Sequence, residues 1–524
     1  MPSDTLALLL AALVNDDFPE LSLTERNSSS EEQQEGRGAQ GISGDCRRVN
    51  WPGRMSCMVR NPSDITLSIP NIVETDGVTQ YEIEVKIGEV SWRVFHRYRD
   101  FQELHEKLVS ERSVSKDLLP PKKVIGNRNP AFVEKRKAGL EKYLREVLIY
   151  LQLTMPREFV EFLHLHEYDI IHLLHTMAER FYLDGDSVLS GSRSQTFSVL
   201  ELHAISERLK LPSEVSEKKY DFSHVLDFCS QLERVIVMPR RGENALEGRS
   251  RADLPLGSSN IIPQSLKFDM VAFKTLQEIQ LIGVSPASIV NAAAIRDSLK
   301  TLHVHLTDTQ RLSDVLLCDD IHKTAVSDPE KVWRSVEVAN FSDNKLIAID
   351  ESIKLLPKIA TLTLDRNELT TVQNLNAMPC LSALSLTENK IAQCLDWHLE
   401  LGNLVTLILS QNFIQSLAGF RKMYSLVNLD VSCNQIGDID EVDHLANLPC
   451  IENIKLTGNP VAGSVDYRSK VLSRFVERIG EMCLDNEKAS QKEVDTALVL
   501  AALKISQDKM DSPRKVSSSL GLLR

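Results

Sequence analysis

The segment Trp92-Arg93-Val94-Phe95-His96-Arg97-Tyr98-Arg99-Asp100-Phe101 changes its pattern half way along. Its first half alternates apolar and polar residues, which predicts a half-buried strand. Its second half places basic residues around one tyrosine and opens a helix with apolar residues at Phe101, Leu104 and Leu108. A guanidinium holds phosphate through its fork of donors and a phenol covers a flat ring, so the junction suits a phosphorylated ring. A solvated helix start beside a core tyrosine explains the segment equally well.

Two later segments favour the phosphate interpretation. A loop motif follows at Leu118-Leu119-Pro120-Pro121-Lys122-Lys123, and a helix that carries Arg136 begins at Phe132. The order is strand, Arg-Tyr-x-x-Phe, helix, Pro-Pro-Lys loop and a helix with an arginine. In this order the three motifs resemble the phox-homology (PX) family, whose domains bind phosphoinositides.

The resemblance implies a role for four residues. Arg97 falls where the family places the arginine for the 3-phosphate, and Tyr98 where it places the ring that packs on the inositol. Lys122 matches the lysine that meets the 1-phosphate, and Arg136 the arginine that holds the free 4- and 5-hydroxyls. The family commonly has Arg-Arg-Tyr-Ser, whereas here His96 and Arg99 replace the first arginine and the serine. An alternative is therefore a segment that is degenerate for lipid and serves protein contacts.

The charge distribution suits an anionic membrane surface. The 524-residue chain has a net charge of −13, which argues against general nucleic-acid binding. Between Lys86 and Arg145, however, 15 Lys and Arg stand against 8 Asp and Glu. Basic residues near anionic lipid contribute about 1 kcal/mol each. Val124 and Ile125 in the following loop are candidates for insertion into the lipid, or they pack under the loop.

Residues 1–60 differ from the rest of the chain and are expected to be disordered, because Ser28 to Gly44 is rich in Ser, Glu, Gln and Gly. The apolar run Leu6 to Val14 is too short to span a bilayer and lacks the charged start of a signal peptide. The nine cysteines form no C-x-x-C pair, which indicates reduced intracellular thiols.

A repeat dominates the second half of the chain. Asparagines recur 22 to 25 residues apart, each after L-x-x-L-x-L-x-x-N, at Asn344, Asn367, Asn389, Asn412, Asn434 and Asn459. This is the leucine-rich repeat, in which the leucines form a continuous core and the asparagine amide bonds the backbone between coils. Apolar residues three apart from Leu369 to Met378 predict a short helical return.

The repeats set the expected boundaries. Degenerate copies extend upstream to Leu232, and a segment from Asn459 to Met482 resembles the cap that closes such arrays. We expect a disordered segment at 1–60, a PX domain at 62–168, a helical connector at 169–230, a capped solenoid at 231–486 and a mobile tail at 487–524. Within the tail, the residues from Val494 to Ile505 are expected to form a helical patch. The fold class is therefore multidomain: a three-stranded antiparallel meander with helices, followed by a solenoid.

The strand residues between the leucines should line the concave face of the solenoid, where repeat proteins bind protein partners. The candidate contact residues are mostly small and polar: Thr363, Asp365, Ser385, Ile408, Asp430 and Lys455. They include no Trp, Tyr or Arg anchor of the kind that dominates binding hot spots, so the pattern does not name a partner.

Motifs for catalysis are absent from the sequence. There is no G-x-x-x-x-G-K-[ST], H-E-x-x-H or G-x-S-x-G. His164 and His166 cannot share one helix face, and His303 and His305 have no third ligand spaced with them. We therefore expect no enzyme activity, no cofactor and no metal.

The two modules together, over about residues 75–500, resemble the nischarin (imidazoline-receptor-antisera-selected) family. Shared segments include His96-Arg97-Tyr98 and Asp466-Tyr467-Arg468. The resemblance implies a peripheral protein, cytoplasmic and recruited to early or recycling endosomes, that binds phosphatidylinositol 3-phosphate. It also implies scaffolding of integrin tails and Rac–PAK signalling that restrains cell migration. The long C-terminal regions of larger family members are missing here. An imidazoline-responsive receptor is the alternative from another class.

Overall fold

The computed structural model describes residues 65–75, 77–122, 130–151, 154–211, 221–239, 260–262, 266–323 and 328–518. The expected disordered segment 1–60 and the loop residues Val124 and Ile125 lie outside these ranges.

The first domain is built on an antiparallel meander of β1 (Ile65–Thr75), β2 (Val78–Ile87) and β3 (Val90–Arg97). The alternation seen in the sequence explains it, since Trp92 and Val94 of β3 are fully buried while Arg93 between them is partly exposed. A short fourth strand, β6 (Asn260–Ile262), pairs antiparallel with β3. The three-stranded meander is thus confirmed, with one added strand.

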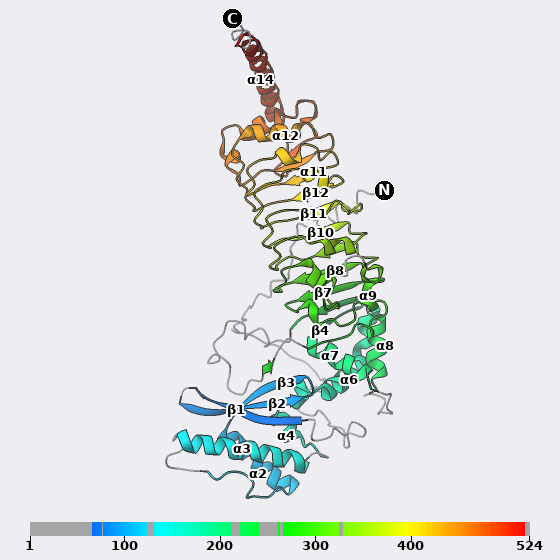
Figure 1. Cartoon of the computed structure of the whole chain (residues 1–524), viewed down its shortest axis with the longest axis vertical. Coiled ribbons are helices and arrows are strands. Elements are labelled where there is room, and N and C mark those ends of the chain that lie inside the picture. Colours follow the sequence, from blue (N-terminus) through cyan, green and yellow to red (C-terminus); the bar gives the residue numbers. More distant parts are fainter. Residues whose placement is uncertain are drawn as a thin grey trace, which may run out of the picture. The chain divides into compact units, whose positions relative to one another are not determined.

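Helices cover one side of this sheet (Figure 1). They are α2 (Tyr98–Arg112), α3 (Pro130–Leu151), α4 (Arg157–Phe162) and α5 (Leu165–Tyr168). Helix α2 buries Phe101, Leu104 and Leu108, the three apolar positions that the sequence singled out. The ring of Phe101 meets the edge of the Tyr143 ring from α3, so the two helices and the sheet share one core.

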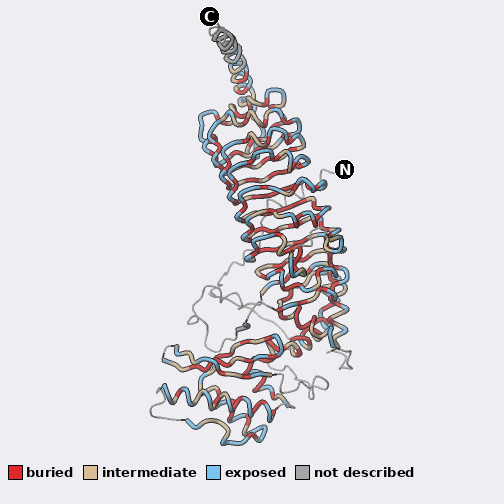
Figure 2. The backbone as a smooth tube through the Cα atoms, viewed as in Figure 1, coloured by how far each residue is buried: buried red, intermediate tan, exposed pale blue. Residues whose placement is uncertain are grey.

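The second domain is a solenoid whose strands stack as one parallel sheet (Figure 1). Aligned leucine positions pair across it, as Leu362 with Leu384 and Leu407 with Leu429. Figure 2 shows the buried residues following the inner side of successive coils. The strands before the cap are β4 (Ser194–Phe197), β5 (Arg234–Val237), β7 (Glu278–Ile282), β8 (Thr301–His305), β9 (Val338–Asn340), β10 (Thr361–Thr363), β11 (Ala383–Ser385), β12 (Thr406–Ile408), β13 (Asn428–Asp430) and β14 (Asn453–Lys455).

The returns between strands are short. They comprise η5 (Pro286–Ser288), α9 (Ala293–Arg296), α10 (Leu312–Leu316), η6 (Pro329–Lys331), η7 (Glu351–Leu355), α11 (Trp397–Glu400), η8 (Ala418–Phe420), η9 (Ile439–Val442) and α12 (Asp443–Ala446). The helical return expected at Leu369–Met378 is wrong: that coil returns through turns. Its apolar residues still reach the core, since Leu369 and Leu375 are buried. The three-residue spacing of these apolar side chains therefore reflects their burial in the core and not a helix.

Each repeat asparagine joins its own coil to the preceding one. The Nδ2 of Asn412 donates to the carbonyl oxygen of Leu386 at 2.9 Å, and its Oδ1 accepts the amide of Ile391 at 3.1 Å. Asn344, Asn367, Asn389, Asn434 and Asn459 also donate from Nδ2 to a carbonyl of the coil before. The amide satisfies backbone groups that would otherwise be buried without a partner.

The solenoid begins earlier than residue 231. Residues 169–230 contain the expected helices α6 (Ile170–Ser190), α7 (Val199–Leu209) and α8 (Ser223–Gln231), but β4 between them already belongs to the solenoid sheet. Phe181 of α6 stacks on Phe228 of α8 at 4.0 Å and meets the edge of Phe197. This aromatic cluster covers the first coil, so the connector serves as its cap.

The C-terminal cap contains η10 (Pro460–Gly463), α13 (Tyr467–Leu472), η11 (Val476–Arg478), β15 (Cys483–Leu484) and β16 (Glu487–Lys488). The helical patch expected from Val494 to Ile505 is confirmed as part of a longer helix, α14 (Gln491–Ser518), so much of the segment expected to be a mobile tail is helical. The start of α14 is fixed by Glu493, which accepts the Ser490 amide at 2.8 Å and pairs with Arg468 at 2.6 Å. Lys504 pairs with Asp443 at 2.7 Å. Apolar contacts add to these polar ones, because Ala497 and Ala501 are buried and Val494 packs against the core of the solenoid.

Candidate functional site

The β3–α2 junction presents Arg97 and Tyr98. The carboxylate of Asp100 accepts the amide of Arg97 at 2.8 Å and thereby caps the start of α2. Burial acts to raise the pKa of Asp100, but hydrogen bonds from the His96 side chain and the Arg97 amide hold it below its ordinary value. The carboxylate is therefore used in the turn, and the exposed Arg97 side chain is left without an ion pair among the described residues.

His96 does not occupy a ligand-facing position. Its ring stacks on Phe162 of α4 at 3.9 Å, and its Nε2 donates to the Phe162 carbonyl at 2.7 Å. Arg99, the other departure from the family pattern, is exposed and pairs with Glu103 at 2.7 Å. Both departures thus have structural partners of their own, separate from the four expected contact positions.

Tyr98 fixes the Pro-Pro-Lys loop. Its hydroxyl donates to the carbonyl oxygen of Pro120 at 2.5 Å, two residues before Lys122. The other side of Pro120 meets Gly139 of α3, where a Cβ atom would lie only 2.8 Å from Cγ of the proline. The loop is held between α2 and α3, and Lys122 leaves it as an exposed side chain.

Arg136 stacks between two rings. Its guanidinium carbon lies 4.4 Å from the centre of the Tyr98 ring and 4.5 Å from that of Phe132. Such cation–π contacts hold the plane of a guanidinium while leaving its edge available for hydrogen bonds. Burial raises the pKa of Tyr98, and the charge of Arg136 opposes this increase, so the phenol keeps its proton at neutral pH.

The structure therefore brings Tyr98 and Arg136 into contact, places Arg97 next to Tyr98 in the chain, and holds the Lys122 loop against Tyr98. Among the described residues, Arg97, Lys122 and Arg136 have no carboxylate partner. One unpaired cation against an aromatic ring, with two more on the segments that meet at that ring, can bind a multiply charged anion that has a flat face.

Sequence reasoning missed several residues of this site. Phe132 precedes Arg136 by one helical turn, and that i, i+4 spacing was a usable signal. Gly139 and Tyr81 gave none, because a glycine in a helix and a tyrosine in a core strand have many structural explanations. Tyr81 is fully buried, and burial raises the pKa of its hydroxyl while the neighbouring Arg136 opposes that effect.

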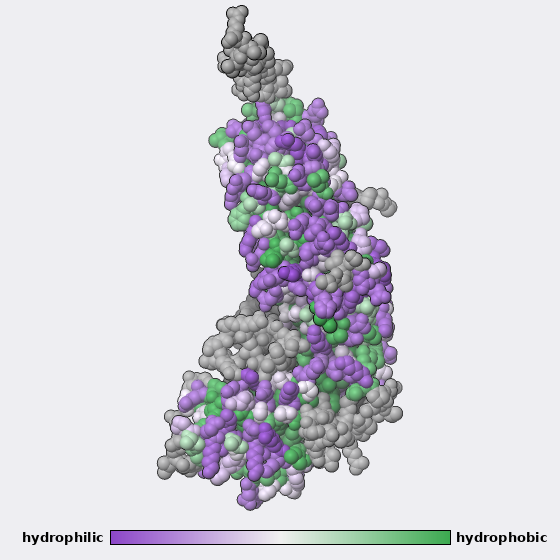
Figure 3. Space-filling model, in the orientation of Figure 1, coloured by the Kyte–Doolittle hydropathy of each residue, from purple (hydrophilic) through white to green (hydrophobic). Residues whose placement is uncertain are grey.

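The concave face of the solenoid holds the other candidate residues. Thr363 and Ser385 are wrong as partner contacts, because both are buried between neighbouring strands. The Ser385 hydroxyl donates to Asp365 at 2.6 Å. Asp430 and Lys455 are paired at 3.3 Å, and Ile408 is half-buried. Figure 3 shows a largely hydrophilic surface with scattered apolar patches on the visible face of the repeats.

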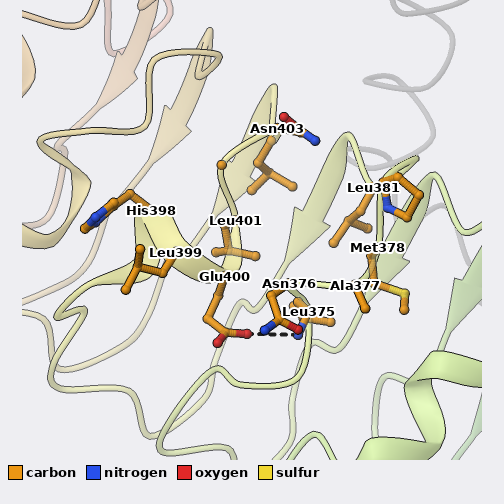
Figure 4. Close-up of a pocket in the computed structure, with 13 residues that line it drawn as sticks. Leu375, Asn376, Ala377, Met378, Leu381, His398, Leu399, Glu400, Leu401 and Asn403 are labelled. Atoms are coloured by element: carbon orange, nitrogen blue, oxygen red, sulfur yellow. Dashed lines mark hydrogen bonds between the residues drawn. The ribbon is translucent and has the colours of Figure 1, made fainter.

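A pocket of about 470 Å³ lies between the returns of two successive coils (Figure 4). Leu375 to Pro379 form one wall and His398 to Leu404 the other. The Glu400 carboxylate accepts the Leu375 amide at 3.1 Å and so joins the two walls. Leu399 at the rim is 68% exposed. The Glu400 carboxylate is thus engaged in structure, and the remaining lining is mixed, with Asn376, His398 and Asn403 beside the apolar residues.

Comparison with known proteins agrees with this geometry. The family model of the PX domain matches residues 84–166, which include β3, Tyr98 and Arg136. This part of the chain is a PX domain. A designed CISK-PX domain of known structure is 36% identical and covers 19% of this chain and 97% of that one, with a TM-score of 0.18. The family model for two copies of leucine-rich repeats matches residues 402–444.

Two curated relatives each match only part of the chain. An uncharacterized leucine-rich repeat-containing protein of Schizosaccharomyces pombe is 33% identical over 152 residues, 28% of this chain and 24% of that protein. The human Kinesin-like protein KIF16B is 32% identical over 130 residues, 23% of this chain and 9% of that protein. The chain thus spans less than a quarter of the length of these relatives. The PX domain and the leucine-rich repeats together indicate phosphoinositide binding and protein interaction.

In the ranges that the structure describes, no helix is both long and apolar enough to cross a bilayer. The same residues include no cluster of three or more His, Cys, Asp and Glu arranged to hold a metal ion.

Proposed function

We propose that the protein is a non-catalytic scaffold whose PX domain binds phosphatidylinositol 3-phosphate and whose repeats bind a protein partner. Arg97 takes the 3-phosphate, Tyr98 covers the inositol ring, Lys122 takes the 1-phosphate and Arg136 takes the 4- and 5-hydroxyls. The observation that carries this proposal is the set of three cations without carboxylate partners on the segments that meet at Tyr98. The Tyr98 ring centre lies 4.4 Å from the guanidinium carbon of Arg136, and the Tyr98 hydroxyl donates to the Pro120 carbonyl at 2.5 Å.

The cellular part of the proposal rests on resemblance to the nischarin family. We infer a cytoplasmic protein recruited to early or recycling endosomes, where the repeats hold integrin tails or components of Rac–PAK signalling and restrain cell migration. The basic excess between Lys86 and Arg145 supports recruitment to an anionic membrane.

Co-sedimentation with liposomes tests the lipid assignment. The full chain is incubated with vesicles that carry each phosphoinositide in turn, and Arg97→Ala is compared with Arg99→Ala. Each variant loses one positive charge, and the two positions are two residues apart. Arg99, however, already pairs with Glu103 and lies outside the proposed contacts. We expect selective binding to the 3-phosphate lipid that Arg97→Ala abolishes and Arg99→Ala retains.

Equal losses in both variants, or binding that follows vesicle charge alone, would exclude a specific pocket. The chain would then be a protein-interaction scaffold only, with a PX domain that does not select a lipid.

The repeat assignment needs its own test. Ile408→Arg places a charge on the concave strand face, while Leu395→Arg places one on a return where the side chain is already 71% exposed. Binding of purified chain to integrin-tail peptides and to PAK should be lost in Ile408→Arg and kept in Leu395→Arg. Retention in both variants argues against the concave face as the docking surface.

A further inference from the structure

The ring contacts of Arg136 do not define how its guanidinium group is rotated within its own plane. Contacts with Tyr98 and Phe132 fix the plane of the guanidinium, but a ring face cannot fix how the group is turned within that plane. A hydrogen bond to Nε would do so, because Nε is the atom nearest the aliphatic stem. In the described structure the Nε atom of Arg136 is buried and has no hydrogen-bond partner.

Tyr81 of β2 offers the missing partner. Its side chain is fully buried, with the ring edge-on to Phe101 at 6.2 Å, and its hydroxyl is another buried polar atom without a hydrogen bond in the described residues. Arg136 lies close enough to this hydroxyl that its polar side chain first, and its charge second, oppose the increase of the Tyr81 pKa that burial causes, although the geometry of a hydrogen bond is not reached. A buried polar group without a hydrogen bond destabilises the folded state, so two such groups near each other call for an explanation.

We propose that Tyr81 is a positioning residue for Arg136: its hydroxyl accepts the Nε–H of Arg136 when an inositol head group enters the PX pocket. This inference rests on the proposed lipid function and deepens it. Turning Nε toward Tyr81 directs both terminal nitrogens of Arg136 to the open side of the pocket. There they meet the hydroxyls at positions 4 and 5 of the inositol ring.

The consequence is selectivity as well as affinity. A guanidinium held at both faces and at Nε has a fixed distance to the ring and accommodates hydroxyls but not bulkier phosphates at positions 4 and 5. A guanidinium held only at its faces can turn aside and admit a lipid with an additional phosphate. Loss of the Tyr81 hydroxyl should therefore change the ratio of affinities between mono- and bisphosphorylated lipids.

Tyr143 provides a matched control. It is also fully buried in the same domain, its hydroxyl also has no hydrogen bond in the described residues, and it also packs edge-on against Phe101, at 6.4 Å. Burial alone raises its pKa, with no contribution from Arg136. Tyr143→Phe thus removes the same atom from the same core without touching the guanidinium.

The experiment measures binding of the full chain, Tyr81→Phe and Tyr143→Phe to liposomes that contain phosphatidylinositol 3-phosphate or the 3,4- or 3,5-bisphosphate. We expect Tyr81→Phe to bind the monophosphate about tenfold more weakly, as for loss of one charge-assisted hydrogen bond, and to lose preference over the bisphosphates. Tyr143→Phe should bind as the wild type does. Melting temperatures of the two variants should agree.

Unchanged affinity and selectivity in Tyr81→Phe would overturn the inference while leaving the lipid function intact. Equal losses in both variants would also overturn it, because they would indicate a general packing effect. If the wild-type chain binds none of these lipids, the proposed function fails, and the inference fails with it.

Discussion

A methyl group at Gly139 of α3 would lie 2.8 Å from Cγ of Pro120, well inside van der Waals contact. The proline ring cannot swing away as a flexible side chain would, because its carbonyl is bound by Tyr98. The absence of a side chain at Gly139 therefore allows the Lys122 loop to lie against the helix that carries Arg136. Two of the proposed lipid contacts depend on this one close approach.

Gly139→Ala should displace the loop and weaken binding to the 3-phosphate lipid several-fold. Overpacking of this kind typically destabilises by about 1–3 kcal/mol, partly offset by the higher helix propensity of alanine. Liposome binding and thermal unfolding measure the two effects. Gly437→Ala is the control, since a Cβ there meets nothing within 4 Å. Wild-type affinity in Gly139→Ala would show that the loop position does not matter for the lipid.

Asn412→Ala should destabilise the solenoid by roughly 2–4 kcal/mol, because it leaves buried backbone groups of two coils without a partner. The asparagine forms bonds to Leu386, Leu409, Ser410 and Ile391. Denaturant unfolding monitored by circular dichroism measures the loss. Gln415→Ala, which removes only an exposed bond to Gln435, should change stability by less than about 0.5 kcal/mol. Similar losses of unfolding free energy in both variants would contradict a structural role for the repeat asparagines.

The thiols of the described residues should fall into two classes of reactivity. Cys380, Cys433 and Cys450 are exposed and Cys229, Cys318 and Cys394 are buried, while Cys483 is half-buried and is left out of the comparison. Burial raises the pKa of Cys229 to about 12 and that of Cys318 to about 11, so little thiolate forms. Iodoacetamide at pH 8 followed by peptide mass spectrometry should modify only the exposed class until denaturant is added. Early modification of Cys229 would place it outside the core.

Docking of α14 should weaken in acid. The Ser490 amide and the Arg468 side chain lower the pKa of Glu493 from 4.5 to about 2. A carboxylate whose pKa is lowered in the folded state contributes stability above pH 4.5, and this contribution is lost as the pH falls towards 2. Hydrogen exchange of α14 amides, corrected for intrinsic rates, should show reduced protection at pH 3 relative to pH 6.

Glu493→Gln separates this effect from the Asp443–Lys504 pair, which also holds α14. Glutamine still accepts the Ser490 amide, so the helix should start at the same place, but the Glu493 part of the pH dependence should disappear. An identical pH dependence in the variant would assign the effect to other carboxylates.

The sequence predicted what depends on periodicity and on short motifs. Alternation located β2 and β3, and the asparagine spacing located the coils. The lipid contacts Arg97, Tyr98, Lys122 and Arg136 were assigned from resemblance to the PX family and stay predictions. What it did not predict depends on contacts between distant positions. The residues next to Tyr81 in the sequence do not predict that it lies near Arg136. The residue type of Ser385 does not predict whether its side chain is buried or exposed. The docking of α14 through Glu493 and Lys504 was missed because charged residues are most often solvated.

Those hydrogen bonds of the repeat asparagines that join two coils run from each coil to the one before it. At the end of the array Asp485 takes over, accepting the amides of Leu456 and Thr457 at 2.8 and 3.0 Å. A coil therefore stays incomplete until its successor is present. During synthesis, each newly made coil must wait for about 22 more residues to leave the ribosome before its backbone is satisfied. A chain truncated from the C-terminus leaves backbone groups of its last coil without hydrogen bonds from a following asparagine. A chain truncated from the N-terminus does not have this defect.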